Sequence, residues 1–131
     1  MEYQDIYIKQ YDWNVRVYYN FTNRKTADIL QYLYDNDYDE NIIDSMYSSL
    51  STSSYNFGAT VINKKDKDAV VIISKATCPQ EFFNTLIHEL NHLSDFIASY
   101  YHISHTGETI SYLIGDIGML LFPKAGKYLC N

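Results

Sequence analysis

The sequence predicts a small α+β domain in which a short antiparallel or mixed sheet packs on helices. Alternating apolar residues in 11–21 indicate one strand, and two β-branched runs at 55–63 and 69–74 indicate two more. Apolar residues at helical spacing in 79–100 and 108–122 indicate two helices in the last third of the chain. The predicted order of strand, helix, helix, hairpin, helix and helix is that of an α+β domain.

The first half of the chain is expected to hold one strand and two helices. Tryptophan, valine and tyrosine side chains alternate with other residues in 11–21, which is the two-residue period of a strand. Apolar residues at helical spacing follow in 24–34, and an acidic break at 35–40 ends that helix. A second, shorter helix is predicted over 41–50, where isoleucine, methionine and leucine recur at helical spacing.

The second half is expected to hold a hairpin and two further helices. The runs 55–63 and 69–74 flank a charged connection, which is typical of a β-hairpin. A long helix is predicted over 79–100, because the proline at its start suits the first helical turn. The last helix is predicted over 108–122, with Pro123 stopping it.

The composition describes an acidic chain of one domain, residues 1–131. Lys and Arg number 10 against 16 Asp and Glu, for a formal charge of −6, so no nucleic-acid partner is expected. The purely apolar runs span only a few residues, so no membrane-spanning helix is expected. The start of the sequence lacks the apolar core of a secretory signal. A cytoplasmic location is therefore expected, where Cys78 and Cys130 stay free thiols.

One motif in the long helix carries chemistry. Residues 88–92 read His-Glu-Leu-Asn-His, which is the H-E-x-x-H pattern of zinc hydrolases. Residues four apart lie on one face of a helix, so the imidazoles of His88 and His92 can bind the same Zn²⁺ ion. Glu89 projects about 100° away around the helix, close enough to act as general base toward a water that zinc activates.

The rest of this helix separates into two faces around the motif. One is a polar stripe that contains both histidines: Glu81, Asn84, His88, His92, Asp95, Ser99 and His102. The other is apolar and is expected to pack on the core: Phe83, Leu86, Ile87, Leu90, Leu93, Ile97 and Tyr101. The two histidines therefore lie on the side of the helix that is expected to face away from the core.

A catalytic zinc site needs a third protein ligand and an open position. Asp95, His102 and His105 are candidates, and Glu108 is preferred because it opens the final helix, which is expected to lie antiparallel to the motif helix. On that helix Glu108, Tyr112, Gly115 and Met119 share one face. The glycine on this face is expected to let the two helices approach closely.

Other polar residues are candidates for supporting roles. Asp95 lies one turn after the second histidine and could accept the free ring N–H of a ligating imidazole. His102, His105 or Tyr112 could stabilise the oxyanion that forms during attack on a carbonyl. A place in a surface loop or at the edge of the core, without a catalytic role, is the alternative for each of these three residues. For Asp95 the alternative is a solvated carboxylate without a partner.

The segments HELNHLSD and GETISYLIGD together resemble the zincin metallopeptidases, in particular the glutamate-liganded gluzincins. The chain looks most like minimal gluzincins and like small metallopeptidases encoded by phages and mobile elements. This resemblance covers about residues 69–122 and implies His88, His92 and Glu108 as zinc ligands, with Glu89 as general base. It also implies that the strand before the active helix, at 69–74, pairs along its edge with an extended substrate.

Two classes of function follow from these features. The first is a zinc-dependent metallopeptidase that hydrolyses a peptide or protein substrate. The second is a catalytically inactive, zinc-stabilised interaction module or virion-associated structural module, which the small size and the 14 tyrosines favour. A fourth protein ligand such as His102 or His105 would indicate the second class, because structural zinc is fully liganded. Imidazole plus carboxylate also suits Mn, Fe or Co.

Overall fold

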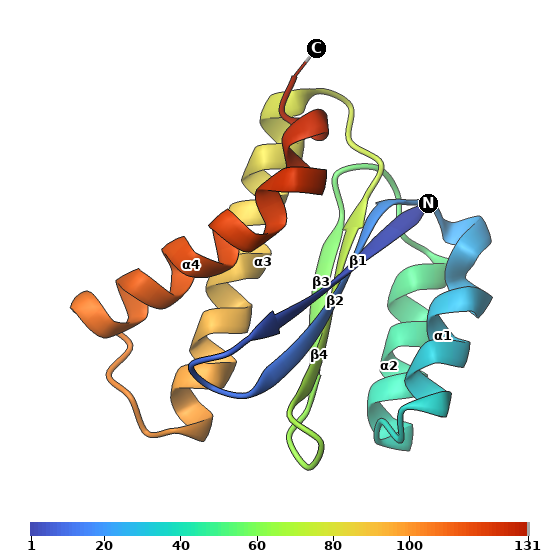
Figure 1. The fold of residues 1–131 in the computed structure, drawn as a ribbon. Coiled ribbons are helices and arrows are strands. Elements are labelled where there is room, and N and C mark those ends of the chain that lie inside the picture. The colour runs from blue at the N-terminus through green and yellow to red at the C-terminus, as the bar shows by residue number, and fades with distance from the viewer. Residues whose placement is uncertain (131) are drawn as a thin grey trace.

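In the computed structural model, which describes residues 1–130, a four-stranded mixed sheet lies between two layers of helices (Figure 1). The α+β class expected from the sequence is therefore confirmed. The described elements in chain order are β1 (Glu2–Ile8), β2 (Trp13–Phe21), the 3₁₀ turn Asn23–Lys25, α1 (Thr26–Asp35), α2 (Glu40–Ser51), β3 (Gly58–Asn63), β4 (Asp68–Ser74), α3 (Pro79–Tyr100), α4 (Glu108–Ala125) and the 3₁₀ turn Gly126–Tyr128.

The sheet has the strand order β1-β2-β4-β3. β1 pairs with β2 and β3 pairs with β4 in antiparallel fashion, whereas β2 and β4 are parallel neighbours. The hairpin expected from the β-branched runs is confirmed, with Gly58 opposite Ile73 and Asn63 opposite Asp68. Parallel strands need a long crossover, and α1 and α2 lie within the one that joins β2 to β4.

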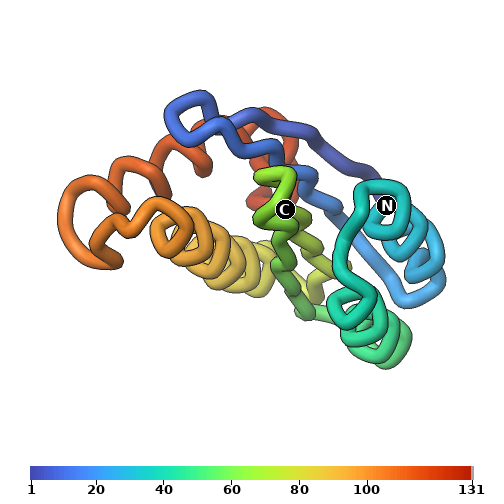
Figure 2. The backbone as a smooth tube through the Cα atoms, turned by 90° about the horizontal axis from the view of Figure 1, so that it is seen from below, coloured from blue at the N-terminus to red at the C-terminus, as the bar shows by residue number. Residues whose placement is uncertain are grey.

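Helices cover both faces of the sheet (Figure 2). Side chains alternate between the two faces of the sheet along β2. Trp13, Val15 and Val17 lie on the side of α3 and α4, and Tyr18 lies on the side of α1 and α2. β4 is buried on both faces, which explains its unbroken apolar run. The sheet thus has a core on each side, and α3 is held against one of them by Leu86, Leu93 and Ile97, which are among its buried side chains.

Two features of the fold differ from the sequence-based expectation. Strand β1 was not predicted, because its outer face is solvent-exposed and its residues are largely polar or aromatic. Pro123 does not stop the last helix, which continues to Ala125. The proline lies in the final turn, where the missing backbone N–H removes only one hydrogen bond from a partly exposed helix end.

None of the helices in the described part of the chain is long and apolar enough to cross a membrane.

Buried tyrosines should make the fold sensitive to alkali. Burial raises the pKa of Tyr19 and Tyr38 above the ordinary value of 10.0, and the hydrogen bond from Tyr38 to Asp68 (2.6 Å) raises the second one further. A raised folded-state pKa contributes stability that is complete below the unfolded value and is lost as the pH rises through the folded value. Each such tyrosine therefore lowers the free energy of unfolding by up to about 1.4 kcal/mol per pH unit above pH ~10.

Urea unfolding between about pH 9 and pH 11 measures this loss. The variant Tyr38→Phe should show a shallower decline, although its stability at neutral pH is lower because it lacks the hydrogen bond. Tyr34→Phe is the matched control, since the side chain of Tyr34 is 72% exposed. A Tyr38→Phe variant that declines in parallel with the wild type would contradict the assignment.

Candidate active site

The two motif histidines lie side by side on α3. Because the helix is continuous from Pro79 to Tyr100, His88 and His92 are one turn apart, and both are exposed. Their Nε2 atoms are 3.1 Å apart. The ring of His92 lies beside Phe96, with ring centroids 6.4 Å apart and the ring planes 22° from parallel.

This spacing fits two ligands of one metal ion. Zinc binds imidazole nitrogen at about 2.0–2.1 Å, and two nitrogens on a tetrahedral ion then lie about 3.3 Å apart. The observed separation of 3.1 Å between the Nε2 atoms differs from that value by a few tenths of an ångström. The residues present therefore supply two converging donors of the kind that zinc prefers.

Glu89 lies in the interface between α3 and β3 and lines the same pocket as His88. Its side chain is only 4% exposed, and the hydroxyl of Thr60 donates to Oε1 at 2.8 Å. Gly58 lies against the same carboxylate, since a Cβ at this position would be 2.8 Å from Oε2 and 2.6 Å from Cγ2 of Thr85. The absence of a side chain at residue 58 thus creates the space that Glu89 occupies.

β3 is an edge strand with a free side next to the motif. The carbonyl of Phe57 accepts from the N–H of Ser74 at 2.9 Å, so Phe57 faces β4. Antiparallel pairing alternates, and the backbone N–H and C=O groups of Gly58 and Thr60 therefore point away from β4, toward the open edge. The strand at 69–74, for which a substrate-pairing edge was expected, is β4, and it lies inside the sheet with β2 and β3 on its two sides. That expectation is wrong, because β3 pairs with this edge of β4 in the hairpin.

A pocket of about 290 Å³ opens between this edge and the motif helix. It is lined by Asn56, Phe57, Gly58, Asn84, Thr85, His88 and Glu89. Apart from the two motif residues, the lining carries no charged side chain. The pocket therefore adjoins one of the paired histidines and the buried carboxylate.

The two faces predicted for α3 need one correction. Phe83 and Ile87 were expected in the core but are 51% and 47% exposed, whereas Glu89 is buried. The helix is rotated so that one flank lies under β3, which covers Glu89. On the other flank α4 leaves Phe83 and Ile87 uncovered.

Glu108 is not grouped with the two histidines. Among residues 1–130, no set of three or more His, Cys, Asp or Glu side chains is placed to hold a metal ion. α4 begins at the tip that stands away from α3 in Figure 1, and Glu108 and Tyr112 are exposed there. Gly115 faces open space, because no atom lies within 4 Å of the position that a Cβ would take. The prediction that α3 and α4 approach closely at this glycine is therefore wrong. The role of Glu108 as a ligand stays a prediction.

The remaining candidates lie near the end of α3. Asp95 Oδ1 is 3.1 Å from Nδ1 of His105, whose Nε2 is 3.2 Å from the hydroxyl of Ser99. Asp95 is thus joined to the loop after α3, and its predicted support of a ligating histidine remains untested. His102 follows the helix with a positive φ of 55° and is exposed, and Tyr112 is 68% exposed.

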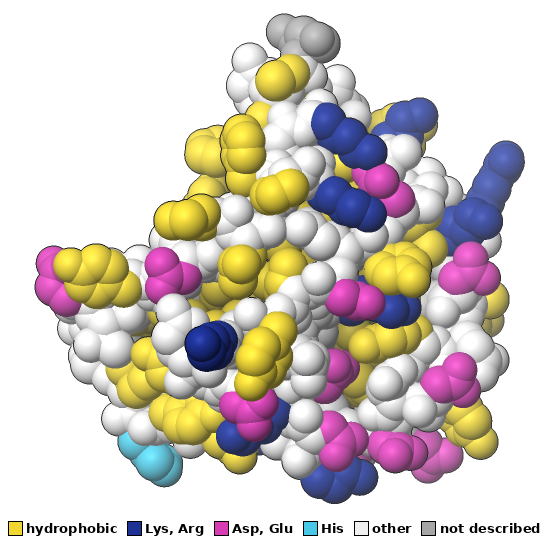
Figure 3. Space-filling model, in the orientation of Figure 1, with side chains coloured by type: hydrophobic (Ala, Val, Ile, Leu, Met, Phe, Trp, Pro, Cys, Tyr) yellow, Lys and Arg dark blue, Asp and Glu magenta, His cyan; other side chains and the backbone are white. Residues whose placement is uncertain are grey.

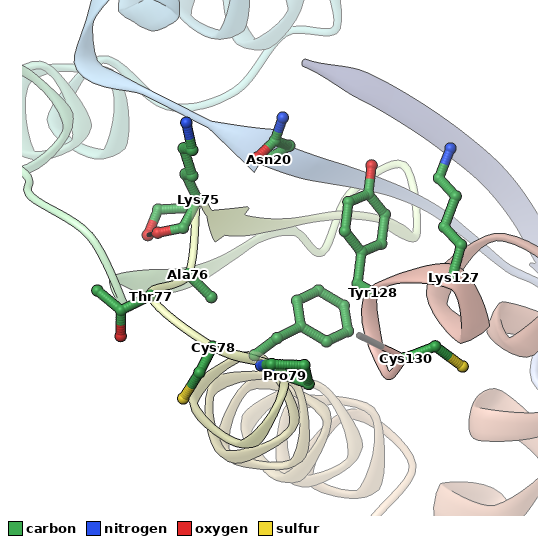
Figure 4. A pocket seen from close by; sticks show the side chains of 11 residues that line it. Asn20, Lys75, Ala76, Thr77, Cys78, Pro79, Lys127, Tyr128 and Cys130 are labelled. Carbon is green, nitrogen blue, oxygen red and sulfur yellow. Dashed lines mark hydrogen bonds between the residues drawn. The ribbon is translucent and has the colours of Figure 1, made fainter.

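A second pocket, of about 310 Å³, lies at the start of α3 (Figure 4). Lys75 and Lys127 line it, together with the two free cysteines, Cys78 and Cys130, whose sulfur atoms lie on opposite sides in this view. It shares no lining residue with the pocket beside His88. The two pockets are therefore separate.

Sequence reasoning missed Thr60 and Gly58, which hold and make room for Glu89. A glycine that opens a β-branched strand is a signal of close backbone approach, and it could have been noticed at Gly58. Nothing in the sequence indicates that the hydroxyl of Thr60 reaches a residue 29 positions away. That contact depends on how β3 packs against α3 in the tertiary structure.

Comparison with known proteins gives no match for this chain. No protein-family model, no curated protein and no solved structure matches the chain. The function proposed for this site therefore rests on the paired histidines, the buried carboxylate and the free strand edge.

Proposed function

We propose that the chain is a zinc-dependent metallopeptidase with a zincin-like, gluzincin-type active site. The observation that carries this proposal is the 3.1 Å separation of the His88 and His92 Nε2 atoms, beside a buried Glu89 and a free strand edge. Two imidazoles on one face of a helix, with an acid next to the first, are two of the ligands and the general base that a metal-assisted hydrolysis uses. Glu108 is the third ligand in this proposal.

Each residue has a definite task in the reaction. Zinc, when bound by His88, His92 and Glu108, supplies Lewis acidity that makes a water nucleophilic near neutral pH and polarises the peptide carbonyl. Glu89 takes a proton from the attacking water and later gives it to the leaving amine. Its burial beneath β3 keeps the carboxylate in one place between these two transfers.

The substrate is an extended peptide that adds to the free edge of β3. The outward N–H and C=O groups of Gly58 and Thr60 can bond the peptide backbone in the manner of an added strand. Such a peptide passes the pocket of about 290 Å³ beside His88, which can hold one uncharged side chain of the substrate. Main-chain pairing supplies affinity, and the pocket supplies selectivity.

The variant Glu89→Gln tests the proposal. It keeps the shape of the side chain and can still accept the Thr60 hydrogen bond, but it cannot take up a proton. We expect peptide cleavage to fall by about 10²–10⁴-fold while the zinc content stays unchanged. Cleavage is measured on a peptide library with mass-spectrometric detection of new termini, and zinc by elemental mass spectrometry.

Glu81→Gln is the control for this variant, since Glu81 lies in the first turn of the same helix and does not line the pocket. It should leave the cleavage rate unchanged. A Glu89→Gln protein that cleaves at the wild-type rate would show that Glu89 is not the general base.

An interaction module is the second candidate, and one observation favours it. Apolar side chains are exposed on the face of α4, notably Met119 at 73%, Tyr112 at 68% and Phe122 at 64% (Figure 3). Exposed aromatic and methionine side chains are enriched where proteins associate. If wild-type protein holds zinc but cleaves no member of the library, this reading becomes the better one.

A further inference from the structure

The carboxylate of Glu89 is held by a residue of the neighbouring strand. We propose that Thr60 of β3 is a positioning residue, whose hydroxyl fixes the Glu89 carboxylate in the orientation in which it meets the attacking water. This inference rests on the proposed peptidase function and adds a residue outside the H-E-x-x-H motif. Its direct basis is the 2.8 Å hydrogen bond from Thr60 Oγ1 to Glu89 Oε1.

The geometry gives the two carboxylate oxygens different roles. Thr60 occupies Oε1, and Oε2 lies on the side of Gly58, 2.8 Å from where a Cβ would be. Gly58 and Glu89 both line the pocket beside His88. Oε2 is therefore the oxygen that Thr60 leaves free for proton transfer, and the absence of a Cβ at residue 58 leaves room for it.

Thr60 is well suited to hold a second group in place. As a β-branched residue it is stiff about χ1, and it lies opposite Val71 in a strand that pairs with β4. A free glutamate side chain populates many rotamers, and bringing it into one orientation costs conformational entropy. The hydrogen bond and the burial impose that orientation when the protein folds, before any substrate arrives.

Thr60 contacts Glu89 and also belongs to the free edge of β3, where the substrate is proposed to bind. The side chain of Thr60 faces α3, while its backbone N–H and C=O point toward the free edge of β3. A peptide that pairs with this edge is therefore placed in register with the residue that holds Glu89. One strand thus positions both the general base and the peptide that the water attacks.

Thr60→Val tests the inference, because valine keeps the shape and β-branching but lacks the donor. We expect kcat to fall about tenfold or more, with KM and zinc content unchanged, since only the alignment of the base is lost. Thr60→Ser restores the hydroxyl and should recover most of kcat. Thr109→Val, at an exposed position on α4, is the control and should behave as wild type.

Three outcomes of the kinetics would overturn the proposal. An unchanged kcat in Thr60→Val would show that the hydrogen bond does not serve the reaction. A loss of zinc, or a rise in KM equal to the loss of kcat, would indicate a structural role instead. Failure of Thr60→Ser to recover activity would show that the hydroxyl is not the group that matters.

Crystal structures separate this inference from the proposed function. We expect Glu89 in one rotamer in the wild type and in Thr60→Ser, and displaced or in several rotamers in Thr60→Val. If Glu89 keeps its orientation in Thr60→Val, the positioning role is wrong even if the wild type cleaves peptides. If the carboxylate moves as expected but the wild type cleaves nothing, the proposed function fails, and the reaction role of Thr60 fails with it.

Discussion

Replacing His88 by alanine should abolish stoichiometric zinc binding. The wild-type protein is expected to hold about one zinc per chain, and one imidazole cannot retain it against a competing chelator. Ligand binding stabilises the native state by about 4 kcal/mol when the free metal exceeds Kd a thousandfold, and this zinc-dependent gain should vanish in His88→Ala. Elemental mass spectrometry of tag-free protein and urea unfolding with and without zinc measure the two effects.

The same measurement tests Glu108, which the structure does not bring to the histidines. Loss of zinc in Glu108→Ala would establish it as the third ligand and would require α4 or the preceding loop to move when the metal binds. Zinc kept in Glu108→Ala but lost in His88→Ala would transfer the role to Asp95, His102 or His105. Glu40→Ala, an exposed acid on the opposite helical layer, serves as control. A wild-type protein that takes up no zinc when it is supplied would refute the metal site itself.

Trp13→Ala should be the most destabilising single change in the core. Trp13 is fully buried at the start of β2 and packs edge-on against Tyr100, with ring centroids 5.6 Å apart. Truncating a buried tryptophan removes its burial energy and leaves a cavity, at a cost of about 3–5 kcal/mol. The free energy of unfolding is measured by urea titration with far-UV circular dichroism.

Two further variants define the cause of this loss. Trp13→Phe should cost much less than the alanine change, because the ring Nε1 is buried without a hydrogen-bond partner among the described residues, so no bond is lost. Phe122→Ala should stay within about 0.5 kcal/mol of wild type, since Phe122 is 64% exposed. Equal losses in Trp13→Ala and Phe122→Ala would contradict the assignment of the core.

Much of the fold could be predicted from local patterns. The periods of β2, α3 and the hairpin follow from apolar spacing, because each of these elements buries one well-defined face. β1 could not be predicted, since its outer face is solvated and carries Tyr3, Asp5 and Tyr7. Its place depends on backbone pairing with β2, which leaves no clear mark in its own side chains.

The candidate site was predictable in part for the same reason. Two residues four positions apart on a continuous helix must share a face, so the pairing of His88 and His92 needs no tertiary information. The surroundings of Glu89 cannot be predicted without tertiary information, because Thr60 and Gly58 reach the carboxylate only when β3 packs against α3. The rotation of α3 that exposes Phe83 depends likewise on which flank its neighbours cover.

The sequence by itself thus determined the α+β class, the motif helix and the spacing of its two histidines, which are consequences of helix and strand periodicity. Only the tertiary structure decided that β3, rather than β4, forms the free edge, and that Glu89 is buried against Thr60. It also decided that α4 begins, at Glu108, at a tip that stands away from α3 (Figure 1). The physical reason is that strand order, helix rotation and helix crossing minimise exposed apolar surface over the whole chain, and no local segment contains that information.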